Sequence, residues 1–97
     1  MVVNDISGRQ SLLKPPFSVG MRSGSVVLEP GESVGEHKTE KREETIIVLK
    51  GAATIVCEGE TFGVRERQLA YIPPECLHNV FNKSSETLEY VYVVAPV

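Results

Sequence analysis

Two histidines and one glutamate carry the side chains best suited to chemistry in this chain. His37 precedes Glu44 by seven residues, and His78, the only other histidine, follows the Pro73-Pro74 pair much later. An imidazole titrates near neutral pH, so a histidine oriented by a carboxylate could act as a general base. If the fold brings the three side chains together, they would form a polar pocket in which they hydrogen-bond to one another or to a small ligand.

The segments that must position these residues have the pattern of short β-strands. From Ser25 onward, runs rich in Val, Ile, Thr and Tyr are separated by turn residues every seven to nine positions. This pattern predicts an all-β, antiparallel sandwich or barrel, and 97 residues leave room for one hydrophobic core. We expect strands near residues 25–29, 34–39, 45–49, 53–57, 61–64, 69–72, 79–81 and 88–95.

Side-chain alternation places the candidate ligands on defined faces of these strands. Residues two apart on a strand point to the same face, so His37 and Thr39 would share one face. Glu44 begins the next strand. If the two strands are neighbours, His37 and Glu44 converge at one end of the barrel, and His78 opens a later strand.

The spacing around the first histidine resembles a family motif. Gly31, His37, Thr39, Glu44 and Gly51 follow in order the first cupin motif, in which a glycine is followed by His-x-His, a glutamate and a closing glycine. The chain departs from the motif at Thr39, which stands where the second histidine is usual.

The later segment resembles the second cupin motif, Pro-x-Gly-x-x-His-x-x-x-Asn. Pro73, His78 and Asn82 match it, whereas Glu75 replaces the motif glycine and Arg67 stands where a glycine is expected six residues before the proline. The two motifs and the strands between them span about half the chain.

The resemblance implies a jelly-roll β-barrel that forms homodimers and uses His37, Glu44 and His78 as ligands of iron, manganese, nickel or zinc. A threonine hydroxyl is a poor ligand for a divalent ion, so the fourth position is expected to be vacant. Metal binding and a metal-free pocket both remain open. Further candidate contacts to a substrate are Thr39, Tyr71, Cys76 and Asn82.

Cysteine and charge patterns add three expectations. Cys57 and Cys76 do not form a CxxC pair, and we expect both to be reduced thiols. Cys76 could be reactive beside His78, or a small apolar filler. The alternating charges of residues 36–43 are typical of a solvated rim.

Residues 1–24 are expected to form an extended arm before the barrel domain of residues 25–97. The Pro15-Pro16 pair blocks a helix in this arm, because proline lacks an amide hydrogen and restricts the residue before it. The arm either adds a strand to a sheet edge or remains a partly disordered tail. The net charge of −3 argues against nucleic acid and anionic membranes as partners. With no signal-peptide pattern, we expect a cytoplasmic protein.

We therefore predict a small-molecule pocket that binds a divalent metal and a ligand such as a sugar or a carboxylate, without deciding whether the protein is an enzyme. One alternative is a metal-free sensor in which His37 and His78 recognise an anionic metabolite. Another is a metal-free isomerase or epimerase that uses one of these histidines as a general base. Ile47 and Leu49 would face away from Glu44, and a second subunit of a homodimer would cover them.

Overall fold

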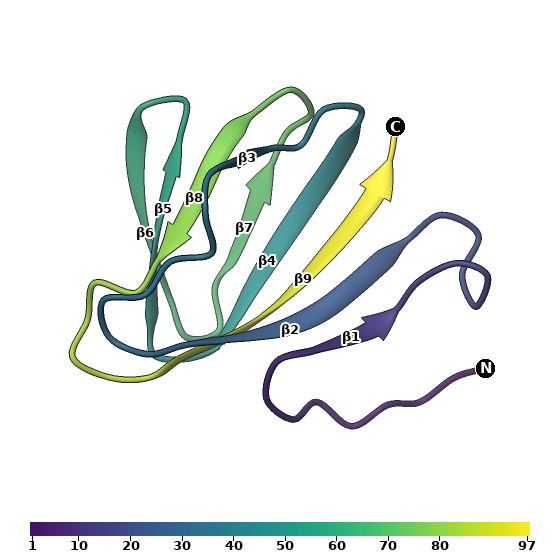
Figure 1. Ribbon diagram of the computed structural model, residues 1–97, viewed down its shortest axis with the longest axis horizontal. Coiled ribbons are helices and arrows are strands. Elements are labelled where there is room, and N and C mark those ends of the chain that lie inside the picture. Colours follow the sequence, from purple (N-terminus) through teal and green to yellow (C-terminus); the bar gives the residue numbers. More distant parts are fainter.

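The computed structural model describes all 97 residues, and every regular element in it is a β-strand (Figure 1). The strands are β1 (Gln10–Leu13), β2 (Arg22–Leu28), β3 (His37–Lys38), β4 (Arg42–Lys50), β5 (Ala52–Cys57), β6 (Glu60–Arg65), β7 (Leu69–Ile72), β8 (Leu77–Phe81) and β9 (Leu88–Pro96). No segment forms a helix of the length and hydropathy that crossing a membrane requires. The predicted all-β jelly-roll fold is confirmed.

The strands form two antiparallel sheets that face each other. The larger sheet has the order β1-β2-β9-β4-β7, and the smaller has the order β3-β8-β5-β6. Neighbours such as β2 and β9 are distant in the sequence, which is the wrapped connectivity of a jelly roll. The polar strand expected over residues 34–39 is shorter than predicted, since only His37–Lys38 forms β3 and the backbone turns at Gly35, whose φ is 110°.

The core lies between the two sheets and is mainly aliphatic. Alternate residues of each strand point inward, and burial of each large aliphatic side chain contributes roughly 1.5–3 kcal/mol. The buried apolar residues are Val26, Leu28, Ile46, Val48, Ala53, Ile55, Val64, Ile72, Cys76, Val80, Leu88 and Tyr90. The core is therefore largely aliphatic, and Tyr90 is the single aromatic residue of this cluster.

The N-terminal arm adds a strand to the edge of the larger sheet. In Figure 1, β1 lies beside β2 at the edge farthest from β6. Gln10 pairs with Ser25, and the Ser25 hydroxyl donates a hydrogen bond of 2.5 Å to the Gly8 carbonyl. Strand β2 already begins at Arg22, so the regular structure of the sheet starts before residue 25. The arm is thereby held against the barrel.

Two residues that replace glycines of the cupin motifs adopt the glycine conformation. Glu75 has a φ of 57° and Arg67 a φ of 65°, both in the left-handed region that costs a residue with a Cβ about 1 kcal/mol or more. At Gly51, whose φ is 81°, an added Cβ would lie only 2.5 Å from the Thr87 carbonyl oxygen. The backbone path of the motifs is thus kept even where the glycine is absent.

The expectation of reduced thiols is wrong in this structure, where Cys57 and Cys76 form a disulfide. Strands β5 and β8 pair so that Cys57 lies opposite His78, two residues from Cys76. The two Cα atoms are therefore 6.4 Å apart, within the range that a disulfide spans. The 19-residue separation resembles no short cysteine motif, and only the strand pairing brings the two sulfur atoms together. Disulfides are rare in reducing compartments, so a cytoplasmic location stays a prediction.

Candidate metal and ligand site

The three candidate ligands come from both sheets and meet at one end of the barrel. His37 on β3 and His78 on β8 are directly paired in the smaller sheet. Glu44 lies on β4 of the larger sheet and shares its inward face with the core residue Ile46. The closest donor atoms of the three side chains all lie within 4.8 Å of one another.

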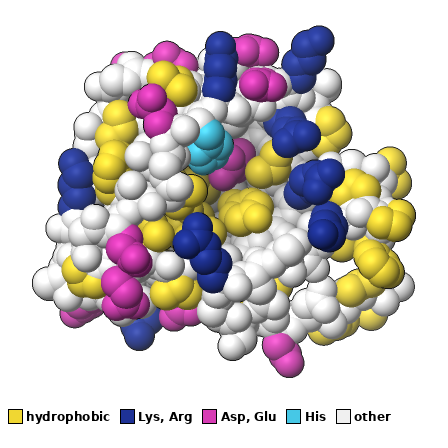
Figure 2. All heavy atoms as spheres, in the orientation of Figure 1, with side chains coloured by type: hydrophobic (Ala, Val, Ile, Leu, Met, Phe, Trp, Pro, Cys, Tyr) yellow, Lys and Arg dark blue, Asp and Glu magenta, His cyan; other side chains and the backbone are white.

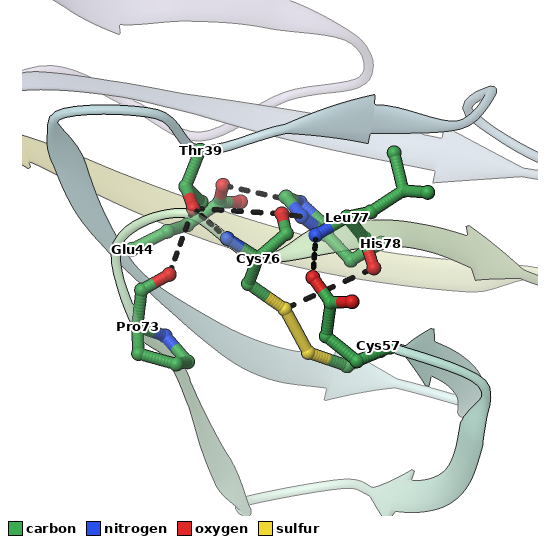
Figure 3. The surroundings of a disulfide bond; sticks show 8 residues. Thr39, Glu44, Cys57, Pro73, Cys76, Leu77 and His78 are labelled. Atoms are coloured by element: carbon green, nitrogen blue, oxygen red, sulfur yellow. Dashed lines mark hydrogen bonds and ion pairs between the residues drawn. A yellow bond between two sulfur atoms is a disulfide. The ribbon is translucent and has the colours of Figure 1, made fainter.

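His78 is fully buried, and its two ring nitrogens have different surroundings. Nδ1 lies 3.1 Å from the Cys76 carbonyl oxygen, so it is the nitrogen that carries the hydrogen and donates it. Nε2 lies 3.6 Å from Glu44 Oε1, which is too far for a hydrogen bond, and has no hydrogen-bond partner. This arrangement leaves the Nε2 lone pair aimed toward a carboxylate (Figure 3).

His37 covers this pair from the solvent side. Its ring centroid is 4.1 Å from that of His78, and the planes are inclined by 61°. Nδ1 lies 3.0 Å from the Gly35 carbonyl oxygen, so the other nitrogen is free. The Gly35 amide donates in turn to the Asn79 side-chain oxygen at 2.9 Å. Asn79, which sequence reasoning overlooked, thus holds the loop that positions His37.

Opposing effects act on the pKa of His78. Burial, the largest effect, lowers the pKa because it disfavours the charged ring. The Glu44 carboxylate and the Cys76 carbonyl stabilise the protonated ring and together outweigh burial. The pKa of His78 is consequently raised above its ordinary value, and the protonated ring would form an ion pair with Glu44 when no cation lies there.

The donor set fits a divalent metal. An unpartnered buried imidazole nitrogen is costly unless something binds it, and a cation would satisfy it together with Glu44 and His37. Both histidines carry the backbone carbonyl contact on Nδ1 that typically orients metal-ligating imidazoles. The three residues could therefore hold an ion such as iron, manganese, nickel or zinc.

Thr39 has a structural task at the position where a second motif histidine is usual. Its hydroxyl donates to the Pro73 carbonyl at 2.7 Å and accepts from the Cys76 amide at 2.9 Å (Figure 3). Both bonds tie the end of β3 to the loop that precedes β8. The hydroxyl is thus occupied by the backbone, and Thr39 braces the loop whose Cys76 carbonyl orients His78.

A cavity of about 530 Å³ opens beside His37 and Glu44. In Figure 2 a histidine and a carboxylate side chain lie at the hollow, and Lys and Arg side chains gather along one side of it. The lining residues are Arg9, Gln10, Ser11, Arg22, Ser25, Val26, Val34, His37, Lys38, Thr39, Arg42, Glu44, Val80, Tyr90, Tyr92 and Val94. This volume lies in the range of small-molecule sites.

Of the four predicted substrate contacts, only Thr39 lines this cavity. Tyr71 is exposed on the outer face of the larger sheet, where its hydroxyl donates to Glu43 at 2.8 Å. The Cys76 sulfur is in the disulfide. Asn82 is fully buried, and its amide donates to the Leu28 and Glu86 carbonyls. Tyr71, Cys76 and Asn82 therefore lie away from this cavity, and the bonds of Cys76 and Asn82 hold parts of the fold together.

Sequence reasoning missed the tyrosines and arginines of the cavity. Tyr90, Tyr92 and Val94 lie on one face of β9, and the alternation of the predicted strand was a signal that could have found them. Arg42, expected in the solvated rim, lies two residues before Glu44 on the same face of β4 and lines the cavity. The arginines of the arm and of β2 had no sequence signal, because only the packing of β1 and β2 brings them to the site.

Residues 24–94 match the model of the family described as the cupin domain. The chain belongs to the cupin family. This cupin is 32% identical over 88 residues to polyketide synthase CurC of Streptomyces cyaneus, a match that covers 88% of this chain and 57% of CurC. The chain thus spans little more than half the length of this relative.

Solved structures share the fold of this cupin. The cupin domain of Cnp3 from Schizosaccharomyces pombe superposes with a TM-score of 0.83 at 17% identity, covering 92% of this chain and 64% of that chain. A Cupin 2 conserved barrel domain protein from Salinispora arenicola CNS-205 gives a TM-score of 0.80 at 27% identity, covering 92% and 75%.

Proposed function

We propose that this cupin binds a divalent metal through His37, Glu44 and His78 and holds an oxygen-bearing small molecule in the adjoining cavity. The observation that carries the proposal is the buried Nε2 of His78, which faces Glu44 without a hydrogen-bond partner. A metal bound there would act as a Lewis acid toward a ligand oxygen. The chain's own residues would position that ligand and exclude water from its buried end.

The residues around the cavity favour a ligand with an apolar body and polar ends. Val26, Val80 and the two tyrosines provide apolar surface, whereas His37 and Glu44 lie at one end. CurC carries the name polyketide synthase. A molecule of the polyketide type combines keto or enol oxygens with a carbon skeleton. It is therefore one example of the ligand class that we propose for this cavity.

The burial of His78 disfavours the rival proposal that this residue acts as a base on a substrate. Its side chain is fully buried and does not line the cavity, so a ligand cannot approach Nε2 without displacing His37 or Glu44. His37 is exposed and remains the more accessible base in a metal-free reaction. A metal-free acid–base enzyme would therefore depend on His37.

Elemental analysis tests the metal proposal directly. Untagged protein purified without chelator, or reconstituted with iron, manganese, nickel or zinc, is expected to hold one ion per site. The isosteric variant Glu44→Gln should lose the ion. Glu43→Gln is the matched control, because the neighbouring carboxylate points to Tyr71 on the outer face. Failure of all four metals to bind, or equal loss of metal in the two variants, would contradict the proposal.

We also propose that the outer face of the larger sheet pairs with a second copy of the chain. Three apolar side chains on this face are about half exposed, namely Leu49 (47%), Leu69 (60%) and Tyr71 (54%). Ile47 on β4 is paired with Leu69 on β7 and belongs to the same face. Such a contiguous apolar strip is typical of an interaction surface. The strip faces away from the cavity, so a dimer formed there would leave both cavities open.

A further inference from the structure

The cavity has a charge opposite to that of the chain. Its lining contains four cationic side chains and one carboxylate, whereas the whole chain has a net charge of −3. Lys38 pairs with Glu75 at 3.4 Å. The guanidinium groups of Arg9, Arg22 and Arg42 form neither an ion pair nor a hydrogen bond with the protein. Three unpaired cations at one cavity repel one another, and an anion would relieve that repulsion.

The strand register places two of these arginines at a defined separation from Glu44. Arg22 on β2 and Glu44 on β4 both pair with Val94 of β9, one from each side. Neighbouring strands are about 4.8 Å apart, so the Cα atoms of Arg22 and Glu44 lie about 10 Å apart on the same inward face. Arg42 precedes Glu44 by two residues, about 7 Å along the strand.

The arm supplies the third arginine. Arg9 directly precedes β1, which is held to the barrel by pairing with β2 and by the bond from Ser25 to the Gly8 carbonyl. Arg9 lines the cavity together with Tyr90 and Tyr92. The arm therefore completes the cationic side of the cavity.

Apolar surface continues along β9 from the row of residues that holds Arg22 and Glu44, on the side away from Arg42. Val94 lies between Arg22 and Glu44, and Tyr92 and Tyr90 continue the same face of β9. The Tyr92 ring lies over Gly24, where an added Cβ would be only 2.5 Å from its hydroxyl oxygen. A ligand held by the arginines would lie against this surface with an apolar or aromatic body.

We propose that the cavity selects an elongated organic anion whose terminal carboxylate or phosphate is bound by Arg9, Arg22 and Arg42. Guanidinium groups match both oxyanions with paired hydrogen bonds. The Glu44 carboxylate repels the anionic end and so orients the ligand, with its uncharged oxygens toward His37. This inference concerns the cavity of the proposed function and specifies the class of molecule that the cavity accepts.

Titration calorimetry with three probes tests the inference. Caffeate carries a carboxylate at one end of an aromatic body and hydroxyl oxygens at the other, and its methyl ester lacks only the charge. Phenyl phosphate shows whether a phosphate is accepted in place of the carboxylate. We expect caffeate to bind about tenfold more tightly than the ester, because a hydrogen bond to a charged group is worth at least one factor of ten. The preference should weaken as salt is added.

Variants that remove one arginine charge test which residues bind the carboxylate of caffeate. Arg22→Gln and Arg42→Gln should each weaken binding of caffeate about tenfold and leave binding of the ester unchanged. Arg65→Gln is the matched control, since Arg65 lies at the end of β6 and does not line this cavity. The inference is overturned if the ester binds as tightly as caffeate, if neither anion binds, or if Arg65→Gln has the same effect as Arg22→Gln.

The design separates this inference from the metal proposal. Each titration is performed on chelator-treated protein and again after metal reconstitution. Arginine-dependent binding by a protein that takes up no metal would support the anion site and reject the metal site. Metal uptake by a protein that binds caffeate and its ester with equal affinity would support the metal site and reject the anion site.

Discussion

His78 Nε2 lies 3.6 Å from Glu44 Oε1, and the two residues come from opposite sheets of the barrel. The contact joins β8 to β4 at the end of the core where Thr39 is also buried. It determines both the proton affinity of His78 and its readiness to bind a cation.

The raised pKa of His78 predicts a pH dependence of stability in the metal-free protein. A histidine whose pKa is higher in the folded than in the unfolded state, where it is about 6.5, stabilises the fold fully below that pH. This contribution is lost as pH rises through the folded-state pKa. We therefore expect the contribution of His78 to the free energy of unfolding to decrease from about pH 5.5 to about pH 8.5, that is, from about one unit below to about two units above the unfolded pKa. Urea denaturation of wild type and His78→Gln measures this contribution.

The variant Glu44→Gln should reverse this trend. Without the carboxylate, burial becomes the dominant effect and lowers the pKa of His78, so protonation would then destabilise the fold. NMR titration of the imidazole measures the pKa directly. An unchanged pKa in Glu44→Gln would show that the carboxylate does not act on His78.

Removal of the Thr39 hydroxyl should destabilise the protein. Thr39→Val keeps the shape of the side chain but leaves the Cys76 amide and the Pro73 carbonyl without their partner. Each unsatisfied buried group costs about 1–3 kcal/mol, so we expect a loss in that range or somewhat above it. Thr39→Ser keeps the hydroxyl and is the control. Equal urea midpoints for the valine and serine variants would contradict the bracing role.

Loss of the disulfide should lower stability through the unfolded state. A crosslink that closes a loop of this length contributes about 3 kcal/mol in the chain-entropy description, and Cys57→Ser combined with Cys76→Ser removes it. Wild-type protein treated with reductant should behave like the double variant. Mass spectrometry that finds two alkylatable thiols in the untreated protein would show that the bond does not form.

The outer apolar strip predicts a homodimer. Sedimentation at micromolar concentration should give twice the mass of the chain, and Leu69→Glu should shift the protein to monomer because it places a charge within the strip. Leu77→Glu is the control, since Leu77 is 42% exposed on the other sheet. A wild-type protein that sediments only as a monomer would reject this interface.

The sequence predicted the fold well because its information is local. Alternation and turn residues identify strands, and the strands expected near residues 53–57 and 61–64 are joined by a tight turn at Glu58-Gly59, with φ values of 49° and 80°. Glu75 and Arg67 show the limit of this reasoning. Both residues stand where the cupin motif has glycine and so depart from the motif. Both nevertheless adopt the left-handed backbone conformation that glycine favours.

The resemblance of two sequence segments to the cupin motifs indicated which side chains could form the site, namely His37, Glu44 and His78. Their positions at strand ends, and the alternation of the strands, follow from the order of residues. Only the tertiary structure decided that His78 is buried without a partner on Nε2, that Thr39 is occupied by the backbone, and that Cys57 reaches Cys76. It also decided that Arg9 and Arg22 meet Arg42 at the cavity. These relationships depend on which strands become neighbours and in what register, and that choice is made by packing between residues far apart in the chain.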